Sequence, residues 1–193
     1  MMKIRSADGL SPDSDWLLRL QQNDTTALAS IMDKYYRDLY HYAGKFTRDE
    51  AVIKDSIQEI FISLWKKRET AAAILALRPY LLRATKNKII KTIFSNDNSY
   101  PLDLPEQYEF LQEYSIEKII IDRQHSDERS ARLKKILANL SPRQHEVIYL
   151  KFYQHLDHNQ IAELMDINRQ SVYNLLHETL QKIRSVWAAE KIV

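Results

Sequence analysis

The side chains best suited to specific chemistry lie near the C-terminus, on a predicted helix that begins at Arg169. Arginine, amide and hydroxyl groups can form hydrogen bonds with base-pair edges exposed in the major groove of DNA. The polar residues on this helix are Arg169, Gln170, Ser171, Tyr173, Asn174 and His177. Their positions predict a helix that reads duplex DNA, although many polar helix faces only contact water.

The residues around this polar face predict the elements that would hold it. Ser141 and Gln144 have the spacing of a helix N-cap with a reciprocal capping box, and Asp157 and Gln160 repeat it. Asn168 ends a short turn and can cap the next helix. The apolar residues of that helix recur at helical spacing: Val172, Leu175, Leu176, Leu180 and Ile183. Three helices with tight turns indicate a helix-turn-helix, and the double capping favours it over a plain helical hairpin.

A second candidate site lies on a basic helix in the N-terminal half. No acidic residue occurs from Thr70 through Asn96. Cations can follow the phosphates of a DNA single strand while an aromatic ring stacks on a base. The residues of this candidate site are Arg78, Tyr80, Arg83, Lys86, Asn87, Lys88 and Lys91. The alternative is a solvated basic face with Tyr80 half in the core.

The helix before the basic one has a different character. Asp55, Gln58 and Glu59 lie three to four residues apart, so they share one surface of a helix. Polar and aromatic residues in combination are typical of a protein interface. The alternative is a core helix with ordinary polar residues outside, and Phe61 and Trp65 are expected in the core.

Composition limits the remaining possibilities. The 193 residues include two glycines, five prolines and no cysteine, which favours helices and excludes disulfides and cysteine-based sites. No apolar run approaches the roughly 18 residues that span a bilayer. The N-terminus lacks the apolar core of a signal peptide, so a soluble cytoplasmic protein is expected. His155 and His158 flank Asp157 but form no ligand set, and we expect no metal and no cofactor.

The charge is divided along the chain. Residues 1–96 carry a net charge of +5, residues 97–130 carry −6 and residues 131–193 carry +3. This pattern predicts two basic helical domains, 1–96 and 130–193, joined by an acidic linker over 97–129.

Amphipathic spacing predicts four helices in the first domain and one more helix before the helix-turn-helix. Ser14 or Asp15 is the expected cap of the first helix. The expected helices contain Leu17–Leu20, Leu28–Phe46, Ile53–Trp65 and Leu82–Ile93, and a further helix is expected over 116–140. The predicted fold is therefore all-α, with a small helical bundle followed by the helix-turn-helix domain.

Two blocks of the sequence resemble bacterial extracytoplasmic-function sigma factors, which belong to the sigma-70 superfamily. The specific part of the first block is the run D-x-x-Q-E-x-F-x-x-x-W from Asp55 to Trp65, followed by RPYLLRATKNKII over 78–90. The strings LSPRQHEVIYLKFYQ, IAELMDI and SVYNLL resemble the second domain of the family. The resemblance covers about 14–95 and 130–187, in the family's order and spacing.

The resemblance implies a transcription initiation factor without enzymatic activity of its own. Asp55, Gln58 and Glu59 would bind the clamp helices of the RNA polymerase β′ subunit. The helix from Tyr80 to Lys91 and the loop over 70–77 would open and read the −10 promoter element. The polar residues from Arg169 onward would read the −35 element, and their domain would contact the polymerase β flap. An anti-sigma factor, often membrane-anchored in this family, is the implied regulator.

The chain departs from the family pattern at three positions. Asp166 stands where many members have glycine, and aspartate tolerates a left-handed backbone better than most residues. Leu175 and Glu178 stand where many members have arginine, which weakens the expected phosphate contact of that helix.

Three other classes of protein would have different binding properties or sequence features. A helix-turn-helix repressor or activator would bind a palindromic operator as a dimer without polymerase. The sequence has no glycine-rich phosphate-binding loop and no cysteine, so it gives a helical enzyme no support. An interaction-only helical protein would keep the interface helix but would not contact DNA.

Overall fold

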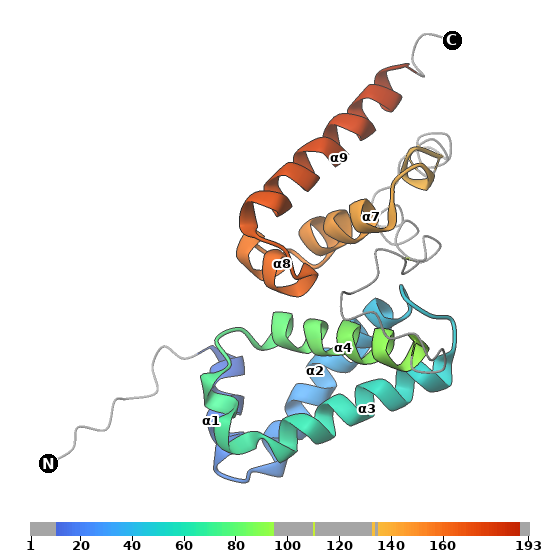
Figure 1. The fold of residues 1–193 in the computed structure, drawn as a ribbon. Helices are drawn as coiled ribbons and strands as arrows, with labels where there is room; N and C mark the ends of the chain where they lie inside the picture. Colours follow the sequence, from blue (N-terminus) through green and yellow to red (C-terminus); the bar gives the residue numbers. More distant parts are fainter. Residues whose placement is uncertain (1–10, 95–109, 111–132, 134, 190–193) are drawn as a thin grey trace, which may run out of the picture.

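The computed structural model describes residues 11–94, 110, 133 and 135–189, and every element within them is helical (Figure 1). The predicted all-α fold is confirmed for this part of the chain. The predicted acidic linker, apart from Phe110, lies outside the described residues. Most of the helix expected over 116–140 lies outside them too. None of the described helices is long and apolar enough to cross a membrane.

The N-terminal domain contains the four predicted helices and one short additional element. These are α1 (Pro12–Gln21), α2 (Thr25–Ala43), α3 (Glu50–Lys66), the 3-10 helix η1 (Arg68–Ala73) and α4 (Leu77–Phe94). Helices α2, α3 and α4 contact one another, and α1 and η1 close one end of the bundle.

The expected cap of α1 was wrong. Ser11 is the N-cap, and its hydroxyl oxygen accepts a hydrogen bond from the backbone N–H of Ser14 at 3.3 Å. Pro12 follows at the first helical position, where its missing N–H costs no hydrogen bond and its fixed φ angle suits a helix. The helix therefore starts three to four residues earlier than the sequence pattern indicated.

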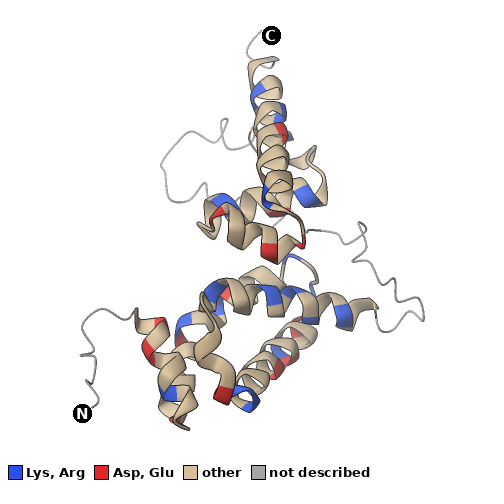
Figure 2. Cartoon of the chain, turned by 60° about the vertical axis from the view of Figure 1, so that its left-hand side comes forward, with Lys and Arg blue, Asp and Glu red and all other residues tan. Residues whose placement is uncertain are grey.

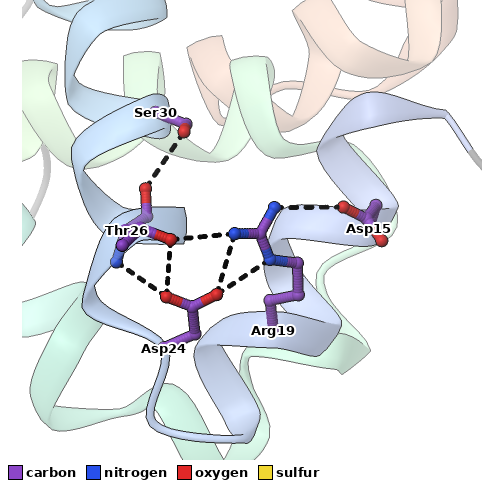
Figure 3. Close-up of polar contacts among 5 residues, drawn as sticks. All are labelled: Asp15, Arg19, Asp24, Thr26 and Ser30. Atoms are coloured by element: carbon purple, nitrogen blue, oxygen red, sulfur yellow. Dashed lines mark hydrogen bonds and ion pairs between the residues drawn. The ribbon is translucent and has the colours of Figure 1, made fainter.

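A polar network fixes the corner between α1 and α2 (Figure 3). Asp24 caps α2 by accepting from the backbone N–H of Thr26 at 2.8 Å. Its carboxylate also lies 2.8 Å from Nη2 of Arg19, and Nη1 of the same guanidinium lies 3.6 Å from the carboxylate of Asp15. Hydrogen bonds from Thr26 and Arg19 lower the pKa of the Asp24 carboxyl to about 2. The two helices are thus joined by a charged cap.

The segment between α3 and α4 was expected to be an apolar loop, but residues 68–73 form the 3-10 helix η1. Ala71 is buried and holds this short helix against the core. The small side chain of alanine allows the backbone to pack closely there. Leu75, by contrast, is fully exposed, with 102% relative accessibility. The segment before α4 therefore presents one bare apolar side chain to solvent.

The C-terminal domain has the predicted helix-turn-helix. It comprises α7 (Pro142–Ile148), a π-helical turn η2 (Tyr149–Tyr153), α8 (His158–Met165) and α9 (Arg169–Ala189). Both predicted capping boxes are present, at the starts of α7 and α8. Asn168 accepts a hydrogen bond from the backbone N–H of Ser171 at 2.7 Å, as expected of a cap. Asp166 occupies the left-handed region, with a φ angle of 55°.

The two domains pack against each other, with α4 lying beneath α8 (Figure 1). One cluster of buried apolar residues runs from α1 through the contact into α9. Figure 2 shows Lys and Arg repeated along α4, the helix directly below the C-terminal domain. The basic helix is therefore a boundary element between the two domains.

Candidate nucleic-acid interface

The six residues predicted to read duplex DNA lie together on the first half of α9. All are exposed except Ser171, which is half-buried. Nε2 of Gln170 donates to Oδ1 of Asn174 at 3.0 Å, so the two amides present one pre-ordered pair. Val172 is completely buried and fixes the opposite side of the helix. This arrangement offers donors and acceptors on a rigid helix, as recognition of base edges requires.

An aromatic row borders this polar face. The rings of Tyr173 and His177 stack with their centroids 6.4 Å apart, and His158 from α8 lies 6.4 Å from Tyr173. His158 sits at the N-terminus of α8, where backbone N–H groups favour an anion such as phosphate. In the described residues no three His, Cys, Asp or Glu side chains gather as a metal site would require.

The seven residues of the basic helix divide into two faces of α4. Tyr80, Asn87 and Lys91 are exposed, whereas Lys88 forms an ion pair with Glu59 of α3. A groove between α3 and α4 runs along Tyr80 and Lys88. This face exposes an aromatic ring, an amide and a cation to solvent.

The other face of α4 is engaged by the C-terminal domain. Nη1 of Arg78 donates to the backbone oxygen of Gln154 at 3.0 Å, and Nη2 donates to Asp38 at 2.9 Å. Arg83 lies 3.9 Å from Asp166 in the turn before α9. Both side chains contact the second domain, although Arg83 is still 49% exposed to solvent and Arg78 is 32% exposed.

Lys86 departs most from its predicted setting. Its side chain is 3% exposed, and Nζ lies 2.8 and 2.9 Å from the two carboxylate oxygens of Glu146 on α7. The Tyr42 hydroxyl donates to the same carboxylate at 2.9 Å, and Glu146 is fully buried. Three charged hydrogen bonds therefore compensate the burial of this ion pair. Lys86 can reach DNA only when the domains separate.

Aromatic rings surround the ion pair. Tyr42 and Tyr149 stack with centroids 5.8 Å apart and an interplanar angle of 7°. Phe46 and Phe110 meet edge to face at 5.5 Å, and Phe110 lies 5.8 Å from Tyr149. Lys45 is also buried here, and burial lowers its pKa to about 7. This interface was not predicted from the sequence. The spacing of Tyr42 and Phe46 fits residues that face the core of their own domain as well as it fits residues that face a second domain.

Comparison with known proteins identifies the two domains. Residues 31–98 match the family model described as Sigma-70 region 2, and residues 130–183 match that of Sigma-70, region 4. Together the matches cover more than half of the chain. The chain belongs to the sigma-70 family. Regions 2 and 4 of this family bind core RNA polymerase and promoter DNA, so the chain is a promoter-recognising sigma factor.

One solved structure agrees with this fold. The sigma factor is similar to a chain of the structure of CnrH in complex with the cytosolic domain of CnrY, with a TM-score of 0.59 and 15% identity. That alignment covers 93% of this chain and 99% of the other. A chain of the RsbN–BldN complex aligns with 17% identity, 88% and 98% coverage and a TM-score of 0.35. No curated protein is close enough in sequence to match.

The family assignment decides between the function classes that the sequence had left open. A stand-alone repressor or activator is not favoured, because the N-terminal domain matches Sigma-70 region 2. The sigma-70 family is also not a family of enzymes.

The sigma factor presents its predicted polymerase-binding residues on one face of α3. Asp55, Gln58 and Glu59 are all exposed, whereas Ile57 and Phe61 are buried and hold the helix against the bundle. The expectation that Phe61 belongs to the core is confirmed, and Trp65 packs against that core partly buried. The face carries two carboxylates and is separate from the polar face of α9.

Proposed function

We propose that this protein is a sigma factor of the extracytoplasmic-function group that positions core RNA polymerase by reading two promoter elements. The observation that carries the proposal is the exposed polar face of α9, located in a domain that matches region 4. A second domain matching region 2 supplies a basic helix. Two nucleic-acid surfaces on two linked domains suit two separate contacts on one promoter.

The −35 element would be read as duplex by Arg169, Gln170, Ser171, Tyr173, Asn174 and His177. Arginine pairs best with guanine and the amides with adenine, and each good bidentate pair contributes roughly 1–3 kcal/mol of discrimination. The Gln170–Asn174 hydrogen bond keeps both amides oriented before DNA arrives. Leu175 and Glu178 give this helix fewer phosphate contacts than arginine would, so its own affinity for DNA is expected to be low.

The −10 element would be opened and held by α4 and the segment before it. Extruding a base costs a few kcal/mol of stacking and pairing. The exposed Leu75 and Tyr80 can cover an unstacked base, and the cations from Arg78 to Lys91 can follow the freed strand. Asn87 lies exposed among them and can form hydrogen bonds with a base edge. Binding to polymerase would supply the rest of the free energy.

The remaining partners follow from the same assignment. Asp55, Gln58 and Glu59 would bind the β′ clamp helices, and the C-terminal domain would contact the β flap. The chemistry of nucleotide addition would belong to the polymerase, so the sigma factor itself is proposed to be no enzyme and to act in the cytoplasm. An anti-sigma factor, membrane-anchored or free, would control it.

The decisive experiment is run-off transcription from genomic templates with core RNA polymerase, with and without this protein. We expect promoter-dependent transcripts only in its presence. As a matched comparison, Asp55→Ala combined with Glu59→Ala should remove the transcripts by preventing assembly with the polymerase. If the wild-type protein yields no promoter-dependent transcript, the proposed function is wrong.

A further inference from the structure

The segment that is proposed to open the −10 element is held from behind by the corner between α1 and α2. This corner comprises the end of α1, the turn over 22–24 and the start of α2, and its charged cap is drawn in Figure 3. Helix α1 packs against η1. Nε2 of Gln21, the last residue of α1, also donates to the backbone oxygen of Glu69 at 2.8 Å. This bond fixes the main chain of η1 directly.

A second bond from the corner runs to Arg68, the first residue of η1. Nε of Arg68 donates to Oδ1 of Asn23 at 2.5 Å, and Nη1 donates to the backbone oxygen of Trp65 at 3.1 Å. The guanidinium also lies over the Trp65 ring, 4.9 Å from its centroid. Arg68 therefore joins the end of α3, the corner and the start of η1.

The acceptor on the corner belongs to an ordered turn. Asn23 has a φ angle of 63°, in the left-handed region that asparagine tolerates better than most residues. Its backbone N–H donates to the backbone oxygen of Leu20 at 2.9 Å, which closes the end of α1. Oδ1 of Asn23 is therefore presented to Arg68 from a fixed backbone.

These contacts place the exposed apolar side chain that the proposed function uses. The backbone N–H of Ile74 donates to the backbone oxygen of Ala71 at 3.0 Å, and Ile74 packs against the apolar core. Leu75 follows directly and is fully exposed. The corner thus fixes η1, and η1 fixes where the chain turns outward. A segment that is ordered in advance loses less conformational freedom when it holds an unstacked base.

We propose that Gln21 and Asn23 are positioning residues for reading of the −10 element. Through Glu69 and Arg68 they hold η1 so that the segment over 74–80 meets the DNA strand in one place. Neither side chain contacts DNA in this role. The role in reading rests on the proposed function of that segment, whereas the support of η1 by the corner does not.

Single substitutions can remove each bond while keeping the backbone. Asn23→Gly keeps the left-handed conformation, which glycine adopts readily, and deletes the acceptor for Arg68. Gln21→Ala deletes the donor to Glu69 and keeps a strong helix former at the end of α1. Asn23→Asp is the rescue variant, because aspartate keeps an acceptor oxygen and tolerates the same backbone region. Gln22→Ala is the matched control, since it removes an exposed amide that takes no part in either bond.

The support of η1 can be measured on the free protein. Because the chain has no cysteine, Ala72→Cys provides a unique and exposed site on η1 for a nitroxide spin label. We expect electron paramagnetic resonance to show a more mobile label when Gln21→Ala and Asn23→Gly are combined. Asn23→Asp and Gln22→Ala should keep the wild-type spectrum. Equal mobility in the double variant and the wild type would overturn the proposal.

The role in reading can be measured by run-off transcription with core RNA polymerase, from templates that differ in single bases of the −10 element. We expect the ratio between the best and the poorest base to fall about fivefold in the double variant, equivalent to about 1 kcal/mol. The ranking of −35 variants and co-elution with core polymerase should not change. A merely structural defect would lower transcription from all templates equally and leave the −10 ratio unchanged, which would contradict a positioning role.

The outcomes separate this inference from the proposed function. If the wild-type protein gives no promoter-dependent transcript, the proposed function is rejected together with the role in reading, while the spin label still decides whether the corner holds η1. If the wild-type protein gives transcripts and the double variant keeps the −10 ratio, only this inference is rejected. If circular dichroism shows the double variant unfolded, Gln21→Ala alone decides by the same two measurements.

Discussion

Single residues on α9 carry the proposed sequence selectivity, and their local settings were largely predictable. A capping box, a buried apolar stripe and a polar helix face each depend on residues within about four positions of one another. They can therefore be predicted from the local sequence. The Lys86–Glu146 pair depends on residues 60 positions apart. A lysine on a basic helix is expected to contact solvent or DNA. No residue near Lys86 in the sequence indicates that its partner is a buried carboxylate. The predicted role of Lys86 in DNA binding stays a prediction for this reason.

Asn174 gives the sharpest test at this scale. Asn174→Ala removes an exposed amide and its bond from Gln170, but it leaves the buried side of α9 intact. We expect transcription from the preferred −35 sequence to fall about tenfold, in keeping with the loss of roughly 1–3 kcal/mol of base discrimination. Association with core polymerase, measured by co-elution, should not change.

Gln181→Ala provides the control for Asn174. Gln181 is another exposed amide on the same face of α9, two turns farther along, where it pairs with His177. Its loss should leave the ranking of −35 variants unchanged. If both substitutions lowered transcription from all promoters equally, a specific role of Asn174 would be contradicted.

At the scale of elements, the sequence predicted most helices but not the irregular turns. Four helices of the N-terminal domain and the helix-turn-helix follow apolar spacing closely enough to be found. The π-helical turn over Tyr149–Tyr153 was not expected, because an extra residue in one turn leaves no mark in a helical pattern. That turn orients Tyr149 toward Tyr42 across the domain boundary. Irregular geometry thus appears where the two domains meet.

The turn between α8 and α9 offers a prediction about stability. Asp166 has a φ angle of 55°, which costs most residues with a Cβ roughly 1–2 kcal/mol, although aspartate is among the better tolerated. We expect Asp166→Gly to raise the free energy of unfolding by about 0.5–1 kcal/mol, since glycine adopts this conformation readily. The lost contact with Arg83 is 3.9 Å long and exposed, so it offsets little of the gain.

Thermal unfolding followed by circular dichroism would measure this effect. Asp166→Asn should behave like the wild type, because asparagine tolerates the same backbone region. Asp166→Val should lower the melting temperature, since a β-branched residue is strained there. If the melting temperature of Asp166→Val were higher than that of Asp166→Gly, the turn conformation would not limit the stability of the domain.

For the whole molecule, the arrangement of the two domains could not be predicted from the sequence. Segment charges indicated two basic domains and an acidic connection, but they did not indicate how the two domains are placed relative to each other. The structure joins them, because Glu146 neutralises Lys86 locally, and Tyr42 both donates a hydrogen bond to Glu146 and stacks on Tyr149. Net charge per domain therefore predicts interaction with DNA, whereas the contact between domains depends on individual buried groups.

Reading two elements from one docked molecule makes promoter spacing a final test. If polymerase holds the two domains at fixed positions, the −10 and −35 elements must lie at one distance and on one face of the helix. DNA turns once in about 10.5 base pairs, so inserting five pairs moves one element to the opposite face. We expect run-off transcription to fall by more than about tenfold, equivalent to 1.4 kcal/mol or more of lost binding. A ten-pair insertion restores the face but not the distance, so it should fail as well. A flexible tether between the domains would let each domain find its element at a changed spacing. Full activity with either insertion would therefore mean that polymerase does not hold the two domains at fixed positions.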